Sequence, residues 1–232
     1  TPIDLADVSA GIVFTALDLT ERKRVERQNQ SLLAEKDILL KEVHHRIKNN
    51  MSTIASLLAL QARGLSSDPA IAALTDARSR INTMMEIYEK LYRSPDYRSV
   101  RATDYLGRLI DGIRLTYSSG TAVRIEKNID DMTLDSRVLF PVGMIVNELL
   151  TNALRHAFPD GRSGLIEVGL VRDGDGMELT VSDDGTGMPA SVDVDNAKGF
   201  GLVLVSTLAE QLGGEVKLVR GKGTLWTIRF PG

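Results

Sequence analysis

The first hundred residues carry hydrophobic positions with a helical period. Residues 20–63 contain no glycine or proline, and their apolar side chains recur at three- and four-residue spacings. The members of this stripe are Leu32, Leu33, Leu39, Leu40, Val43, Ile47, Met51, Ile54 and Leu58. Because residues three or four apart share one face of an α-helix, the pattern predicts a long amphipathic helix over residues 20–63. The segment Asp18-Leu19-Thr20 offers helix-capping side chains at its start, and Gly64 offers a stop at its end.

A second helix is predicted over residues 68–92, where apolar residues again recur with helical spacing. Asp68 suits the capping position and Pro69 suits the first turn. A short loop joins this helix to the first, so we expect the two to form an antiparallel hairpin. A third helix is predicted over about residues 103–117.

The pattern changes at residue 123, beyond which strands and helices mix. Alternating polar and apolar positions predict strands at 123–129, 165–172, 177–182, 215–220 and 224–230. Asp135 caps a predicted helix that ends at Ala157, and another helix is predicted over about residues 200–212. Strict β-α-β alternation is missing, so the predicted class is α+β: a long helix and helical hairpin, followed by an α/β sandwich.

Composition excludes some classes of function. The net charge of −3 argues against a broad nucleic-acid-binding surface, and the lack of cysteine excludes disulfides and thiolate metal sites. No apolar run approaches the roughly 20 residues that a bilayer crossing needs, and no signal peptide is present. We therefore expect a cytoplasmic location, no membrane segment within these 232 residues and no nucleic-acid partner. Thr1 is not a natural start, so we expect a piece of a longer protein.

Two adjacent histidines occur in the sequence EVHHRIKNN at residues 42–50. On the predicted helix, His44 shares the apolar stripe with Ile47, whereas His45 shares the polar face with Lys48. A metal site is not expected here, because no second histidine lies four residues away and the chain has no cysteine.

Phosphorylation makes different demands on an imidazole. It requires an exposed ring nitrogen, a partner that fixes the tautomer, and cations that offset the phosphoryl charge. His45 meets the first demand, Glu42 is the candidate partner, and Arg46 and Lys48 are the candidate cations.

The second half of the chain contains three segments that suit a nucleotide. In NELLTNALRHAF, at 147–158, Glu148 and Asn152 share a helical face with Arg155 or His156. Carboxylate and amide oxygens suit Mg²⁺, which binds through few protein groups together with phosphates. An arginine at this position suits a phosphate.

The other two segments are rich in glycine. In VSDDGTGMP, at 181–189, Asp183 ends a strand and can accept a hydrogen bond from an adenine amino group. In KGFGL, at 198–202, glycines open a helix whose N-terminus suits phosphate. The glycines concerned are Gly185, Gly187, Gly199 and Gly201. A dinucleotide-binding fingerprint and a Walker A loop are both missing.

These three segments resemble, in order, the N, G1 and G2 boxes of the Bergerat-fold ATPases, which include gyrase, Hsp90, MutL and sensor histidine kinases. EVHHRIKNN on a helical hairpin resembles the dimerisation and histidine-phosphotransfer segment of bacterial sensor histidine kinases of the HisKA_2 type, which is related to the HWE group. The resemblance covers roughly residues 36–232. Residues 11–26 also resemble the last strand of a PAS or LOV sensor domain, running into its signalling helix.

The resemblance assigns roles to individual residues. It implies ATP and Mg²⁺ as cofactors, His45 as the phosphoacceptor, and Asn152 and Glu148 at the magnesium ion. The expected catalytic residues are His45, Glu148, Glu42 and Lys48. The expected nucleotide-binding residues are Asn152, Arg155, His156, Asp183, Gly185, Gly187, Gly199, Gly201 and Thr224.

The chain departs from the family pattern in three places. Many histidine kinases have an acidic residue directly after the phosphoacceptor, where this chain has Arg46. HWE kinases have histidine before the glutamate of the N box, where this chain has Asn147, which favours the HisKA_2 type. An F box is missing, so a short lid is expected over about residues 189–198.

Four parts are predicted from this resemblance: the end of a PAS-like sensor domain (1–19), a signalling helix (20–36), the phosphotransfer hairpin (37–95) and a Bergerat-fold catalytic domain (96–232). The predicted function is an ATP-dependent protein histidine kinase that passes its phosphoryl group to an aspartate of a response regulator receiver domain. An upstream sensor domain is expected in the same chain, and the hairpin is expected to form a homodimer or to remain monomeric. The alternatives are a non-catalytic scaffold with a nucleotide switch, and a Bergerat ATPase whose Glu148 activates water.

Overall fold

The computed structural model describes residues 18–65, 67–92, 99–117, 123–189 and 200–232. The chain divides into two compact units, Thr1–Asn50 and Met51–Gly232. The strand predicted at 11–17, and with it the resemblance to a PAS or LOV domain, lies outside the described residues. Among the described helices, none combines the length and hydrophobicity that a bilayer crossing requires.

Helix α1 (Thr20–Arg63) has the bounds that its hydrophobic period predicts. The N–H of Thr20 donates to Oδ1 of Asp18 at 2.9 Å, so within the predicted capping segment 18–20 the side chain of Asp18 accepts a hydrogen bond from the first turn. Most of the large apolar side chains along the helix are exposed in this chain; Leu32 is 61% exposed and Leu39 is 60% exposed. Much of the apolar stripe of α1, especially its N-terminal part, is therefore exposed in this chain.

Helix α2 (Asp68–Tyr92) also has the predicted bounds, but its cap differs from the prediction. The N–H of Ile71 donates to the carbonyl of Ser67 at 3.0 Å, so Ser67 accepts the first bond of the helical turn. Ser67 therefore occupies the capping position, and Asp68 lies inside the first turn, where its negative charge suits the helix dipole.

A mixed sheet forms the centre of the second unit, and its five strands are the predicted ones. The spatial order is β2 (Val123–Ile129), β4 (Gly164–Asp173), β5 (Gly176–Asp183), β7 (Gly223–Pro231) and β6 (Glu215–Gly221). Strands β2 and β4 are parallel, while all other neighbours are antiparallel. The parallel pair is possible because a helix separates β2 from β4 along the chain.

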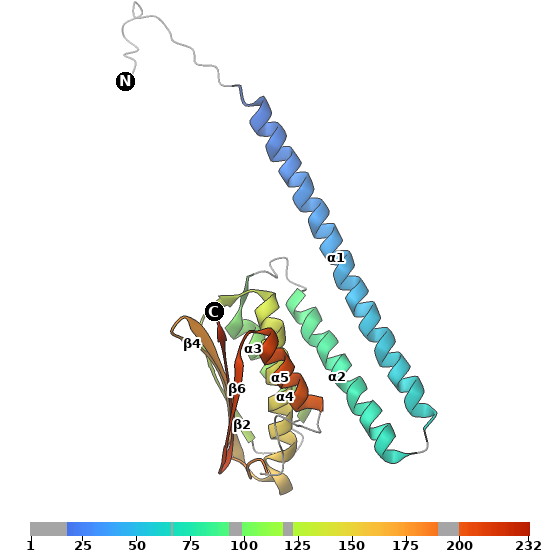
Figure 1. Ribbon diagram of the computed structural model, residues 1–232, viewed down its shortest axis with the longest axis vertical. Helices are drawn as coiled ribbons and strands as arrows, with labels where there is room; N and C mark the ends of the chain where they lie inside the picture. The colour runs from blue at the N-terminus through green and yellow to red at the C-terminus, as the bar shows by residue number, and fades with distance from the viewer. Residues whose placement is uncertain (1–17, 66, 93–98, 118–122, 190–199) are drawn as a thin grey trace, which may run out of the picture. The chain divides into compact units, whose positions relative to one another are not determined.

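Three helices cover one face of this sheet: α3 (Ala102–Tyr117), α4 (Ser136–His156) and α5 (Phe200–Gln211) (Figure 1). Alternate residues of the strands are buried beneath them, as a period of two requires. Helix α2 packs against α4, and its Ile87 and Leu91 are each 1% exposed within the same hydrophobic core. The second helix of the predicted hairpin thus shares its core with the sandwich.

Two short strands escaped the sequence analysis. Strands β1 (Val100–Arg101) and β3 (Thr133–Leu134) pair antiparallel outside the main sheet. A two-residue strand is too short to show an alternating pattern, so only the folded chain reveals it. A single 3₁₀ turn, Pro159–Gly161, follows α4.

Candidate nucleotide-binding site

Helix α4 carries polar residues into the interior of the fold. The N–H of Arg137 donates to Oδ1 of Asp135 at 2.7 Å, which confirms the predicted cap of this helix. All residues from 141 to 150 are buried, including Asn147 and Glu148, which are 6% and 3% exposed. A carboxylate buried this deeply needs a cation or strong hydrogen-bond donors beside it.

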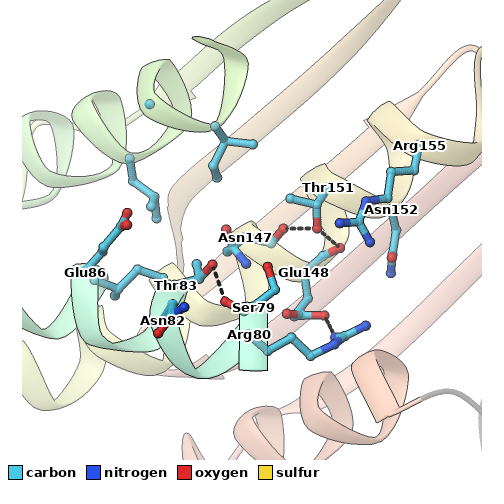
Figure 2. A pocket seen from close by; sticks show the side chains of 14 residues that line it. Ser79, Arg80, Asn82, Thr83, Glu86, Asn147, Glu148, Thr151, Asn152 and Arg155 are labelled. Carbon is cyan, nitrogen blue, oxygen red and sulfur yellow. Dashed lines mark hydrogen bonds and ion pairs between the residues drawn. The ribbon is translucent and has the colours of Figure 1, made fainter. Parts of the chain in front are cut away.

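Arg80 of α2 supplies that cation. Its Nη1 forms an ion pair with Oε2 of Glu148, and the two side chains are 20% and 4% exposed (Figure 2). Arg80 is not among the site residues predicted from the sequence. A signal was present, because Arg80 is in helical register with Met84, Ile87 and Leu91, which otherwise form an apolar stripe.

A pocket of about 440 Å³ opens between α4, α5 and the ends of β5 and β7. Its apolar lining is Leu149, Ala153, Ala157, Val181, Met188, Pro189, Leu202 and Trp226. Its other lining residues are Arg80, Asn152, His156, Asp183, Thr186, Gly187, Gly201 and Thr224. An apolar wall with a few placed polar groups suits a purine ring that carries a charged tail. We call this the nucleotide pocket.

Asp183 lies in the wall of the nucleotide pocket, where β5 ends. It is opposite Thr224 in the register of β5 with β7, and its Oδ1 accepts a hydrogen bond of 3.0 Å from the N–H of Gly185. Burial raises the pKa of Asp183, and hydrogen bonds from Gly185 and Thr224 oppose that rise. The carboxylate is thus partly desolvated in the wall of the pocket, where it can accept hydrogen bonds from a ligand such as the amino group of a base.

The glycines after Asp183 let the loop fold closely against its neighbours. A Cβ at Gly185 would collide with the carbonyl of Ala157, and that same carbonyl accepts a hydrogen bond of 3.0 Å from the N–H of Thr186. Gly187 has a φ of 76°, a backbone conformation that residues other than glycine rarely adopt. Glycine at positions 185 and 187 therefore allows this loop to lie at the edge of the nucleotide pocket.

A second, smaller pocket of about 290 Å³ lies between α2, α3 and α4 (Figure 2). Arg155 lines this second pocket, whereas His156 lines the nucleotide pocket. The sequence left open which of these two residues faces a phosphate, and the fold separates them onto different pockets. Arg80 and Asn152 line both pockets, so they stand at the boundary between them.

The remaining glycine motif is described only in part. Gly201 lies in the first turn of α5 and lines the nucleotide pocket. Gly199 and the predicted lid beyond Pro189 lie outside the described residues. Among the residues that the structure describes, no group of three or more His, Cys, Asp or Glu side chains could hold a metal ion. A magnesium ion that shares Asn152 and Glu148 with phosphates does not need such a group.

The two histidines of α1 differ in exposure as predicted. His45 is exposed, whereas His44 is half-buried. Burial lowers the pKa of His44, and the charge of His45 adds to this effect. Nε of Arg46 pairs with Oε1 of Glu42 at 2.8 Å. Glu42, the predicted partner of His45, thus forms an ion pair with Arg46, the residue after His45. The role of Glu42 beside His45 stays a prediction.

Two family models match different parts of the chain. Residues 42–117 match the family model described as "Histidine kinase" (HisKA_2). Residues 140–232 match the model described as "Histidine kinase-, DNA gyrase B-, and HSP90-like ATPase". The chain belongs to the histidine kinases. Residues 42–117, which include His45, and residues 140–232, which include Asp183, thus each match a histidine kinase family model.

Two named relatives align along most of this histidine kinase chain. The sensor histidine kinase PdtaS of Mycobacterium tuberculosis is 31% identical over 234 residues, which are 99% of this chain and 46% of PdtaS. Blue-light-activated histidine kinase 2 of Erythrobacter litoralis is 33% identical over 207 residues, which are 85% of this chain and 58% of the relative. The chain therefore spans about half the length of these relatives.

A solved structure agrees with the fold. The histidine kinase domain of a blue-light-activated histidine kinase from Erythrobacter litoralis superposes with a TM-score of 0.61 at 25% identity. The superposition covers 79% of this chain and 94% of that domain. The α+β architecture predicted from the sequence is thereby confirmed.

Proposed function

We propose that this chain is the catalytic core of an ATP-dependent protein histidine kinase in which His45 receives the γ-phosphoryl group. The observation that carries the proposal is the nucleotide pocket, whose wall combines Asp183, Asn152 and Gly201 with an apolar lining. Its volume of about 440 Å³ suits a nucleotide. The same chain exposes His45 within the segment that matches the histidine kinase family.

Each lining residue has a distinct task in this proposal. Asp183 accepts a hydrogen bond from the adenine amino group, while Thr224 orients the carboxylate of Asp183. The first turn of α5 at Gly201 directs backbone N–H groups toward the phosphates. Asn152 and Glu148 offer oxygen ligands to Mg²⁺, which neutralises phosphate charge when it is bound.

The chemical step belongs to His45. A ring nitrogen of the neutral imidazole forms a bond to the γ-phosphorus, the bond from that phosphorus to the bridging oxygen of ADP breaks, and ADP leaves. Because a neutral imidazole carries its own lone pair, the step does not require an acidic residue at position 46, where this chain has arginine. Most of the rate comes from positioning and electrostatics, as in other phosphoryl transfers.

The partners and the division of the chain follow from the same proposal. We assign 37–95 to the phosphotransfer hairpin and 96–232 to the catalytic domain, with the signalling helix (20–36) and the end of a sensor domain (1–19) before them. The exposed apolar side chains of α1 within this hairpin, which include Leu39 and Val43, support a homodimer through the hairpin. The phosphoryl acceptor would be an aspartate of a receiver domain in the cytoplasm, and light scattering of the chain tests the dimer.

Labelling with [γ-³²P]ATP and Mg²⁺ tests the proposed activity. We expect wild type to incorporate an acid-labile label, His45→Ala to lose it, and His44→Gln to keep it as a matched control on the neighbouring ring. Asn152→Ala should abolish the label while the far-ultraviolet circular dichroism spectrum stays unchanged.

Other results would favour other functions. ATP binding by wild type without any labelling would favour a scaffold with a nucleotide switch. Phosphate release that persists in His45→Ala would favour an ATPase. A label that survives in His45→Ala would place the phosphoacceptor elsewhere.

A further inference from the structure

Arg80 stands where the helical hairpin meets the nucleotide pocket. It belongs to α2, yet it lines the nucleotide pocket, whose other lining residues come from α4 and its C-cap, from α5, from the ends of β5 and β7, and from the loop after β5. Its guanidinium is fixed by the ion pair with Glu148, and only 20% of its side chain is exposed. The cation is therefore oriented before any ligand arrives, and a phosphate would not have to order it.

The first turn of α5 meets the same guanidinium. A Cβ built at Gly201 would lie 2.9 Å from Nη1 of Arg80, 3.5 Å from Nη2, and 2.7 Å from Oε2 of Glu148. The guanidinium, the carboxylate and the first turn of α5 thus converge at one point, and glycine at position 201 leaves the space for them. A helix N-terminus and an arginine side by side both favour a phosphate between them.

We propose that Arg80 binds phosphate in the nucleotide site. Helix α2 contributes this residue, and its guanidinium recognises the terminal phosphate of ATP. This inference rests on the proposed function, because it places the phosphates of ATP between Asn152 and Gly201. Arg80 exchanges the carboxylate of Glu148 for the terminal phosphate when the nucleotide binds.

The exchange has a physical cause. A divalent ion at Glu148 and Asn152 competes with the guanidinium for the carboxylate of Glu148, and the γ-phosphate offers the guanidinium another anion. ADP has no γ-phosphate, so Arg80 keeps Glu148 when ADP binds. Arg80 therefore sets the preference for ATP over ADP, and that preference depends on α2 being docked against α4.

Calorimetric titration of the whole chain with ATP and with ADP, in MgCl₂, tests the proposal. The variants are Arg80→Gln, which removes the charge, and Arg80→Lys, which keeps a charge without the planar fork. Arg78→Gln is the matched control, because Arg78 is an exposed arginine two residues earlier on the same helix. A charge-assisted hydrogen bond of this kind corresponds to about 10-fold or more in affinity.

We expect Arg80→Gln to lose about 10-fold or more in affinity for ATP and less than about 3-fold for ADP. Arg80→Lys should fall between this variant and wild type, and Arg78→Gln should match wild type. Two results for Arg80→Gln would overturn the proposal. An equal or complete loss of affinity for both ATP and ADP would show that Arg80 only supports the fold. Tighter ATP binding would show that Arg80 blocks Glu148. If wild type itself binds neither nucleotide, the proposed function fails instead.

Discussion

The guanidinium of Arg80 in α2 forms an ion pair with the carboxylate of Glu148 in α4, a residue 68 positions further along the chain. The pair joins the second helix of the hairpin to the central helix of the sandwich. Both side chains are mostly withdrawn from water, so each charge depends on the other for compensation.

Replacing only one member of this pair should destabilise the fold. We expect Arg80→Met to lower the free energy of unfolding by about 3–5 kcal/mol, because the carboxylate of Glu148 would stay buried without its cation. A second substitution, Glu148→Gln, should recover most of the loss. Urea unfolding of the single and double variants measures both effects. Arg101→Met, which breaks the exposed pair with Asp104, should stay close to wild type and serves as the control.

Asp183 should reduce the stability of the nucleotide-free protein, although it contributes to nucleotide binding in the proposed function. Its pKa is raised in the fold mainly by burial, so its protonated form is favoured there. The resulting stability is present below the ordinary pKa of about 3.9 and is lost as the pH rises through the folded pKa. At pH 7 the ionised carboxylate is therefore a cost to the free protein.

Thermal unfolding of Asp183→Asn tests this reasoning. Without nucleotide at pH 7, we expect the variant to unfold at a higher temperature than wild type, and with saturating MgATP the order should reverse because only wild type binds tightly. Asp175→Asn, in the exposed hairpin turn, should follow wild type in both conditions. A variant that is less stable in both conditions would contradict the cost assigned to the buried charge.

Two glycines should respond in opposite ways to alanine. At Gly201 a Cβ would crowd both Arg80 and Glu148, so Gly201→Ala should lower both the stability and the affinity for ATP. At Gly107, in the interior of α3, a Cβ would meet nothing within 4 Å. Gly107→Ala should therefore raise the free energy of unfolding by about 0.5–1 kcal/mol, because alanine loses less backbone entropy in a helix. Similar responses at the two positions would argue against a crowded junction at Gly201.

The buried hydroxyl of Tyr105 should lower the stability of the fold, so its removal should stabilise the protein. The hydroxyl has no hydrogen-bond partner among the residues that the structure describes. Burial also raises the pKa of Tyr105, because the ionised form of the hydroxyl would lose its hydration. We expect Tyr105→Phe to raise the free energy of unfolding by about 1 kcal/mol, because a desolvated hydroxyl is lost and the ring remains. Chemical denaturation measures it, and Tyr105→Ala should instead lose about 3 kcal/mol or more by leaving a cavity.

Local patterns in the sequence predicted most of the elements. The period of 3.6 residues gave the bounds of α1 and α2, and the period of two gave all five strands of the main sheet. Asp135 was correctly predicted as a cap, and Asp18 lies in the predicted capping segment 18–20, because a cap satisfies N–H groups only two or three residues away. The prediction of Asp68 as a cap was wrong by one residue, since Ser67 and Asp68 are both good capping residues and only the hydrogen bond decides between them.

The sequence by itself determined which face of each element is apolar, that His45 is the outward histidine of its pair, and the order of the three nucleotide segments. These properties depend on residues a few positions apart. Tertiary structure alone decided that Arg80 meets Glu148, that Arg155 and His156 line different pockets, and that Asp183 is partly desolvated. Such contacts depend on how α2, α4 and the sheet pack together, and no local period specifies the neighbour that a side chain meets from a distant part of the chain.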